Sequence, residues 1–201
     1  MPANLLWRVM MALVVIGAAA SQAHAYGYAE AEDPVVPIFR DGASAARGGD
    51  FSTAASKARE ALAIIKSHKL SGPALAPKIE AATKSKDAQA MARLLANIVY
   101  LSMKQKLETN IADKLANFPD SKARLFLARK SYADVLEGNL KKNDPELDGK
   151  ILLWFDEALA ALGNPGLFGI GQKPADLGRF TRAARDIEQA IEGFYTSFDK
   201  Q

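Results

Sequence analysis

Hydrophobic residues recur at intervals of three and four along most of the chain, which is the period of amphipathic helices. The strongest run is 87–118, which contains neither Gly nor Pro. Its apolar positions are Leu94, Leu95, Ile98, Val99, Leu101, Met103, Leu107, Ile111, Leu115 and Phe118. Asp87 suits an N-cap, and Asn117-Phe118-Pro119 is a typical stop. Because so broad an apolar face exceeds what a surface helix buries, we expect a central helix with two or more helices packed against it.

The same periodicity predicts further helices, each with its own start or stop signals. Their ranges are 35–47, 50–69, 73–86, 119–143, 145–162 and 174–198. Asp50 and Asp144 suit N-caps, Pro119 and Pro145 suit first turns, and Gly163 suits a C-cap. The last range carries a seam suited to antiparallel packing, formed by Leu177, Phe180, Ala184, Ile187, Ile191, Phe194 and Phe198.

No stretch alternates hydrophobic and polar residues with the period of two that a half-buried strand requires. We therefore expect an all-α protein, an up-and-down bundle of five to six helices in a single domain covering 35–201. The ranges 35–47 and 73–86 are short, and Pro77 weakens the second. Gly138 marks either a close helix crossing or a glycine that its helix tolerates.

The first 25 residues have the layout of a secretory signal peptide. Arg8 supplies a small positive region, 9–20 is an apolar run, and Ala23-His24-Ala25 is a typical cleavage signal. Cleavage after Ala25 leaves an acidic stretch, 26–34, which we expect to be a flexible tail. We expect no stable membrane span once the signal is removed, because no later run reaches ~18 apolar residues.

Composition narrows the setting and the partners. The chain has a formal charge of +3, and its basic residues are dispersed, so we expect no nucleic-acid binding. The chain contains no Cys, which excludes disulfides, thiolate metal sites and a Cys nucleophile. Together with the signal peptide, this composition indicates a periplasmic or secreted protein.

The loop 164–173 mixes three glycines with apolar residues. It lacks both the Gly-Lys-Ser/Thr sequence and the preceding strand of a phosphate-binding loop. We expect Leu167 and Phe168 to fold over the end of the bundle, and the alternative is that the loop lines a ligand site. Trp154 lies at helical spacing among apolar residues, so core packing is its expected role. The candidate residues for binding a ligand or partner are Leu167, Phe168, Ile170, Tyr132 and Trp154.

Few residues suit metal binding or nucleophilic catalysis. The Glu-x-x-His pairs of di-iron bundles are absent. His24 leaves with the signal peptide, and His68 lies in a basic stretch typical of a helix end. A Ser-His-Asp triad would need His68 as its base, and no G-x-S-x-G sequence is present. We therefore expect no catalytic residue, no metal and no bound cofactor.

Two groups of acidic residues have structural explanations. The first group is Asp144, Glu146 and Asp148, and the second is Asp186, Glu188 and Glu192. Acids at a helix start interact favourably with the helix dipole, which explains the first group. The second group is assigned to the solvent face of the last helix. A metal site made of carboxylates alone stays open in principle.

The range 125–198 combines spaced hydrophobic residues, an Asp-Pro-Glu-Leu helix start, a Gly-containing loop and a final amphipathic helix. The residues of this pattern are Tyr132, Leu136, Leu140, Asp144, Pro145, Glu146, Leu147, Ile151, Phe155, Asp156 and Leu162. The arrangement resembles the C-terminal part of the imelysin-like helical-bundle family, which includes periplasmic proteins linked to bacterial iron uptake. The family's His-x-x-Glu metal motif has no match in this chain. The resemblance therefore implies a diverged bundle without that metal site.

These observations favour an exported, non-enzymatic helical bundle that binds a protein partner or a small ligand. An exposed apolar patch near the loop 164–173 would mark its binding site. The alternative is a periplasmic protein that handles iron or another cofactor. That role needs inward-facing carboxylates or tyrosines, such as Tyr100, Tyr132 and Glu137, to converge in one pocket. An enzyme is the third hypothesis, and it requires a cleft with strongly shifted carboxylate pKa values.

Overall fold

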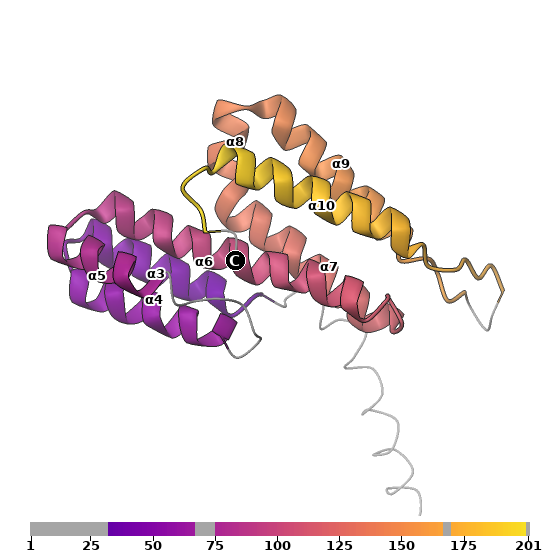
Figure 1. Cartoon of the computed structure of the whole chain (residues 1–201), viewed down its shortest axis with the longest axis horizontal. Helices are drawn as coiled ribbons and strands as arrows, with labels where there is room; N and C mark the ends of the chain where they lie inside the picture. The colour runs from indigo at the N-terminus through magenta and orange to yellow at the C-terminus, as the bar shows by residue number, and fades with distance from the viewer. Residues whose placement is uncertain (1–31, 67–74, 167–169, 200–201) are drawn as a thin grey trace, which may run out of the picture. The chain divides into compact units, whose positions relative to one another are not determined.

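The computed structural model describes residues 32–66, 75–166 and 170–199 (Figure 1). The predicted signal peptide, His68, Leu167 and Phe168 lie outside these ranges. Within them the regular secondary structure is helical, joined by turns and loops, one of which carries an isolated antiparallel bridge between Asn164 and Lys173. The predicted all-α helical-bundle class is therefore confirmed.

The helices follow the predicted ranges closely. In chain order they are α3 (Val35–Arg47), α4 (Phe51–Lys66), α5 (Leu75–Ser85), α6 (Ala88–Ala112), α7 (Phe118–Ser131), the π-helical turn η1 (Tyr132–Leu136), α8 (Glu137–Asn143), α9 (Pro145–Ala161) and α10 (Leu177–Phe194). Because α7, η1 and α8 follow one another without a break, the described residues form seven helical runs. The sequence predicted a bundle of five to six helices although it gave seven helical ranges, and each of these ranges, the short 73–86 included, forms a helical run of its own.

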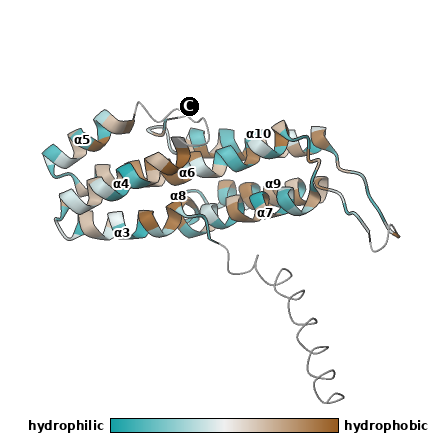
Figure 2. Ribbon diagram, turned by 90° about the horizontal axis from the view of Figure 1, so that it is seen from below, coloured by the Kyte–Doolittle hydropathy of each residue, from teal (hydrophilic) through white to brown (hydrophobic). Residues whose placement is uncertain are grey.

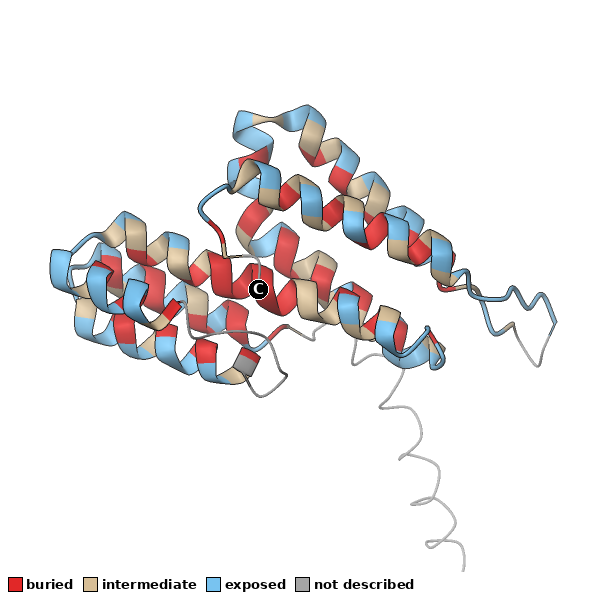
Figure 3. Ribbon diagram, viewed as in Figure 1, coloured by how far each residue is buried: buried red, intermediate tan, exposed pale blue. Residues whose placement is uncertain are grey.

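The helix α6 is central, as its broad apolar face predicted. It packs against α3, α4, α5, α7, η1 and α10. Residues 97–103 are all buried, so this stretch of α6 is covered on every side (Figure 3). The Asp87 side chain accepts a hydrogen bond from the Ala90 amide at 2.9 Å and caps the helix as expected.

The predicted end of the central helix at 118 is wrong. The helix stops at Ala112, and Lys114 and Leu115 adopt left-handed backbone conformations with φ of 53° and 56°. Leu115 is buried, so packing of its side chain accompanies this turn. Asn117 then caps α7 by accepting from the Asp120 amide, and Pro119 lies in the first turn as predicted.

Local signals place the two ends of α9 correctly. Asp144 accepts from the Leu147 amide at 2.9 Å and caps α9. Gly163 follows α9 with φ of 75°, and a Cβ there would lie 2.5 Å from the Lys173 carbonyl oxygen, so only Gly fits. Gly138 has open space around its Cβ position, so it is a tolerated glycine and not a close crossing.

The helix α10 carries both hydrophobic and hydrophilic residues, as an amphipathic helix does (Figure 2). It packs mainly on α9 and also on α6. It ends at Phe194, so the expected continuation of its seam to Phe198 as helix is wrong. Tyr195 leaves the helical region with ψ of 66°, and the chain turns. The 195–199 segment then lies against α6, where Phe198 is buried.

The start of the folded region also differs from the prediction. Asp33 falls within the stretch 26–34 that was predicted as a flexible tail, yet its side chain is buried. It accepts hydrogen bonds from the Val35 amide and from the Ser102 hydroxyl, and it pairs with the ammonium group of Lys106. These contacts attach the start of α3 to α6. Within the described ranges, no helix combines the length and apolarity needed to cross a membrane.

Candidate functional site

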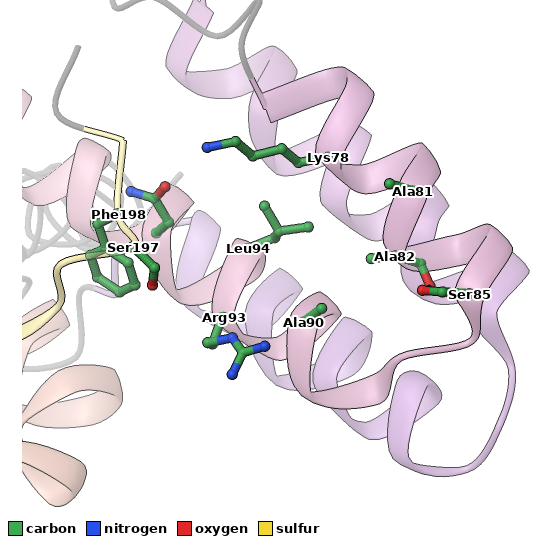
Figure 4. A pocket seen from close by; sticks show the side chains of 10 residues that line it. Lys78, Ala81, Ala82, Ser85, Ala90, Arg93, Leu94, Ser197 and Phe198 are labelled. Atoms are coloured by element: carbon green, nitrogen blue, oxygen red, sulfur yellow. The ribbon is translucent and has the colours of Figure 1, made fainter.

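A groove with a volume of about 380 Å³ lies between α5, α6 and the 195–199 segment (Figure 4). We call it the α5–α6 groove. It is lined by Lys78, Ala81, Ala82, Ser85, Ala90, Arg93, Leu94, Asn97, Ser197 and Phe198. Small and apolar side chains form most of this surface because α5 presents alanines where it faces α6. Its volume lies within the range of small-molecule sites in proteins.

The 195–199 segment closes one end of the α5–α6 groove. Asn97 donates from its side-chain amide to the Asp199 carbonyl at 3.1 Å, and its side-chain oxygen accepts from the Asp199 amide at 2.8 Å. Lys78 donates to both carboxylate oxygens of Asp199, at 2.8 and 2.9 Å. The main chain of Asp199 is therefore fixed by α6, and its side chain is held by α5.

An aromatic cluster supports this end of the groove. The Phe198 ring stacks on Tyr195 with a centroid separation of 4.6 Å and an interplanar angle of 8°. It also lies 5.8 Å from the ring of Tyr100 on α6. The Tyr195 hydroxyl donates to the Leu136 carbonyl at 2.8 Å, which connects the segment to η1. Burial raises the pKa of Tyr195, so this hydroxyl keeps its proton at neutral pH.

The charged residues that line the α5–α6 groove are both positive, and the Asp199 carboxylate pairs with one of them, Lys78. Lys78 extends along the groove toward the end that Ser197 and Phe198 close (Figure 4). Arg93 is exposed on α6, and no acidic partner for it lies within the described part of the chain. The residues that line the groove include these two cations and no carboxylate.

A second cavity, with a volume of about 460 Å³, lies between α6 and α10. We call it the α6–α10 cleft. It is lined by Lys104, Glu108, Ile111, Ala112, Arg185, Glu188, Gln189 and Glu192. Glu192 accepts from the Tyr100 hydroxyl at 2.6 Å and from Lys104 at 3.1 Å. Burial and the bonded carboxylate raise the pKa of Tyr100 well above its usual value. The assignment of Glu188 and Glu192 to the solvent face of the last helix is therefore wrong.

Glu188 is the unusual residue of the α6–α10 cleft. One of its carboxylate oxygens is buried and has no hydrogen-bond partner. Burial raises the pKa of Glu188 to about 7, and the negative charges of Glu108 and Glu192 add to the effect, against the opposing charges of Lys104 and Arg185. The cleft thus has the raised carboxyl pKa that an enzyme was expected to need. Burial in a helix contact produces the same shift, so we assign no reaction to it.

The tyrosines of the cofactor hypothesis bind different carboxylates. Tyr132 is buried and donates to Asp148, itself buried, at 2.6 Å. Burial and this carboxylate raise the pKa of Tyr132. Tyr100 instead donates to Glu192 in the α6–α10 cleft, and Glu137 pairs with Lys141 on the same helix at 3.5 Å. The three side chains do not form one hydrogen-bonded group.

The other candidate residues do not gather into a site. Trp154 is partly buried and packs against the core, as expected. Ile170 is 81% exposed, in a loop closed by paired hydrogen bonds of 2.8 and 2.9 Å between Asn164 and Lys173. Among the described residues this loop presents Ile170 to solvent, while Leu167 and Phe168 lie outside the described ranges.

The buried group around Asp33 has a structural role. Ser102 and Lys106 are one helical turn apart, with 2.8 Å between the hydroxyl oxygen and the ammonium nitrogen. A serine and a lysine at this distance can form a catalytic pair. Here Lys106 is held by the Asp33 carboxylate and Ser102 is buried, so the group fastens the start of α3.

Neither metal-binding groups nor known relatives assign a function to the described residues. Across 32–66, 75–166 and 170–199, no group of three or more His, Asp or Glu residues is arranged to hold a metal ion. The chain matches no protein-family model, and searches of curated proteins and of solved structures find no match. The resemblance to the imelysin-like family therefore stays a prediction.

The residues of the α5–α6 groove were not among those singled out in the sequence. One signal was present: Asn97 is a polar residue within the most apolar stretch of α6. A polar side chain on such a face needs a buried partner, which in this case is the main chain of Asp199. The partner could not be identified from helical periodicity, because it follows the last helix and returns to α6 through a turn.

Proposed function

We propose that this protein is an exported helical bundle that binds a small, largely apolar ligand in the α5–α6 groove. The observation that supports the proposal is the combination of volume and lining. A cavity of about 380 Å³ is large enough for a compact organic molecule, and three alanines, Leu94 and Phe198 supply the apolar part of its walls. Such a surface favours an apolar ligand because burial removes hydrocarbon from water on both sides.

The position of the groove also supports binding. Its walls come from two helices and from a segment that hydrogen bonds fix to α6. A preformed site loses little conformational entropy when a ligand enters. The export of the protein and its periplasmic or secreted location are part of the same proposal, and they are supported by the sequence of residues 1–25.

A neutral fluorescent probe tests the proposal. N-phenyl-1-naphthylamine is apolar, uncharged and brighter in apolar surroundings. We expect saturable binding to the purified protein. Ala81→Trp places a large side chain in the groove from its exposed wall on α5 and is expected to lower the affinity about tenfold or more, because the occupied volume is no longer open to the probe.

The matched control for this variant is Ala63→Trp. Ala63 is exposed on α4, and it is not among the residues that line the groove. We expect this variant to bind the probe like the unmodified protein. Equal binding by both tryptophan variants would place the probe elsewhere, and absence of saturable binding to the unmodified protein would refute the proposed function.

The imelysin-like resemblance supports a second role, in handling iron or another cofactor. Its test is the metal content of the protein purified from its native compartment, measured by elemental analysis together with an absorbance spectrum. A stoichiometric metal or chromophore would favour this alternative over the apolar-ligand proposal.

A further inference from the structure

The 195–199 segment indicates which kind of ligand the α5–α6 groove accepts. Phe198 places a buried aromatic ring at the closed end of the groove. The next residue, Asp199, places a carboxylate on Lys78. The chain itself therefore places an aromatic ring and a carboxylate next to each other at this end of the groove.

Another anion can replace the Asp199 carboxylate on Lys78 at little cost in stability. The Lys78 side chain is 48% exposed and that of Asp199 is 23% exposed. Ion pairs with this exposure contribute little to stability, because water solvates both partners when they separate. The Asn97 hydrogen bonds go to the main chain of Asp199, so its carboxylate can leave Lys78 while the segment stays in place.

Arg93 supplies a second positive charge on the lining of the groove. It is exposed, and the described residues provide it with no acidic partner. Arginine binds carboxylates through parallel hydrogen bonds with good geometry. Arg93 therefore adds positive charge for an anionic group on a ligand, and such a group would reach Lys78 by replacing the Asp199 carboxylate that pairs with it.

We propose that the ligand of the α5–α6 groove is an organic acid with a compact apolar body, and that the Asp199 carboxylate competes with the ligand's anionic group for Lys78. This inference rests on the proposed function, since it concerns the same groove. The ligand's apolar body lies along the alanines and Leu94, and its anionic group binds Lys78, while Arg93 adds positive charge on the α6 side of the lining.

Two probes that differ in one sulfonate separate this inference from the proposed function. N-phenyl-1-naphthylamine reports on the apolar body alone, and 1-anilinonaphthalene-8-sulfonate adds an anionic group to the same ring system. In Asp199→Asn the carboxylate is lost, while the main-chain hydrogen bonds to Asn97 are kept. We expect the affinity for the sulfonate to rise about three- to tenfold, because Lys78 becomes available, and the affinity for the neutral probe to change less than about twofold.

The direction of this effect distinguishes competition from damage. A disrupted groove would bind both probes more weakly, whereas competition predicts tighter binding of the anion alone. Asp156→Asn, which removes an exposed carboxylate paired with Arg129, controls for the change in net charge and is expected to leave both affinities unchanged.

Two further variants test the cations. Lys78→Gln is expected to weaken sulfonate binding about threefold or more and to abolish the gain from Asp199→Asn in the double variant. Arg93→Gln is expected to weaken sulfonate binding, whereas Arg59→Gln, which changes an exposed arginine on α4, leaves it unchanged. If the neutral probe binds but Asp199→Asn does not raise sulfonate affinity, the competition is refuted and the proposed function stands. If neither probe binds, both proposals fail.

Discussion

The two cavities beside α6 are built from opposite kinds of surface. The exposed surface of the α5–α6 groove is mostly apolar, and Asn97 on its lining is hydrogen-bonded to the main chain of Asp199. The α6–α10 cleft is lined mainly by charged residues, and a buried oxygen of Glu188 has no partner. A satisfied apolar surface is available to a ligand without cost to the fold. A buried, unsatisfied carboxylate lowers the stability of the contact that contains it.

Tyr100 touches both regions. Its ring lies against Phe198 at the closed end of the groove, and its hydroxyl binds Glu192 in the cleft. The same buried side chain thus makes an apolar contact through its ring and a contact with a charged residue through its hydroxyl. The comparison predicts that changes in the groove alter packing and ligand binding, whereas changes in the cleft alter the pH dependence of stability.

The largest expected effect is the loss of the Phe198 ring. Phe198→Ala removes a buried side chain that stacks on Tyr195 and leaves the 195–199 segment with fewer apolar contacts. We expect the free energy of unfolding to fall by about 2–3 kcal/mol, somewhat less than for a ring enclosed in a core, because the segment can relax. Urea unfolding measures this value.

The control for this prediction is Phe126→Ala. Phe126 is 37% exposed on α7, so its truncation is expected to cost about 1 kcal/mol or less. Equal losses for the two variants would show that Phe198 is not packed as described and would weaken the account of the groove.

The next effect is a gain in stability that depends on pH. Glu188 has a pKa of about 7 in the folded protein against 4.5 for an unperturbed glutamate. Between these values the unfolded chain releases the proton while the folded protein keeps it, so stability falls as pH rises through this window and stays reduced above it. The full shift corresponds to roughly 3 kcal/mol, and partial solvation of the carboxyl reduces the expected effect to about 2 kcal/mol.

Glu188→Gln removes this titration while keeping the shape of the side chain. We expect the variant to be about 2 kcal/mol more stable than the unmodified protein at pH 8.5, with the difference fading toward pH 5. Urea unfolding at several pH values measures it. Glu80→Gln, a change on the exposed face of α5, is the matched control and is expected to show no such trend. A constant difference across the pH range would contradict the assignment to Glu188.

A smaller effect is expected at the residue that links the two regions. Tyr100→Phe keeps the ring against Phe198 and removes one hydrogen bond to Glu192, which keeps Lys104 as a partner. We expect a loss of about 1 kcal/mol in the free energy of unfolding and less than a twofold change in neutral-probe affinity. Tyr132→Phe, which removes the bond to the more deeply buried Asp148, is expected to cost about 2 kcal/mol. A large change in probe affinity for Tyr100→Phe would show that the cleft and the groove are coupled.

Signals local in sequence predicted most of the fold. The range 35–47 is α3 itself, and the caps at Asp87, Asp144 and Gly163 are where the sequence placed them. Each of these depends on a residue and its neighbours within one turn. The predicted helix ends were wrong where packing between residues far apart in the sequence determines the path of the backbone. Lys114 and Leu115 turn the chain without a glycine, and Phe198 returns to α6 although its spacing continues the seam of α10.

The two cavities could not be predicted for the same reason. Glu188 and Glu192 are one turn apart on α10, which is equally typical of a solvent face and of a face that meets another helix. Which of these holds depends on the path of α6. The groove likewise depends on α5 and the 195–199 segment, which are far apart in the chain, meeting at Lys78 and Asp199. Helical periodicity contains no information about that meeting.

The smallest expected effect is that of replacing Lys78, a lysine of the groove, and Lys104 of the cleft provides the comparison. Lys78 pairs with Asp199 beside the groove with 48% of its side chain exposed, whereas Lys104 pairs with Glu192 in the cleft with 14% exposed. We expect Lys78→Gln to change the free energy of unfolding by about 0.5 kcal/mol or less, because water replaces the lost partner. Lys104→Gln leaves a carboxylate that is only 16% exposed with one partner fewer, and about 1–2 kcal/mol is expected. Thermal and urea unfolding at low and moderate salt measure both values. If Lys78→Gln proved as costly as Lys104→Gln, the Lys78–Asp199 pair would be part of the framework, and a ligand carboxylate could not replace Asp199 as readily as we infer.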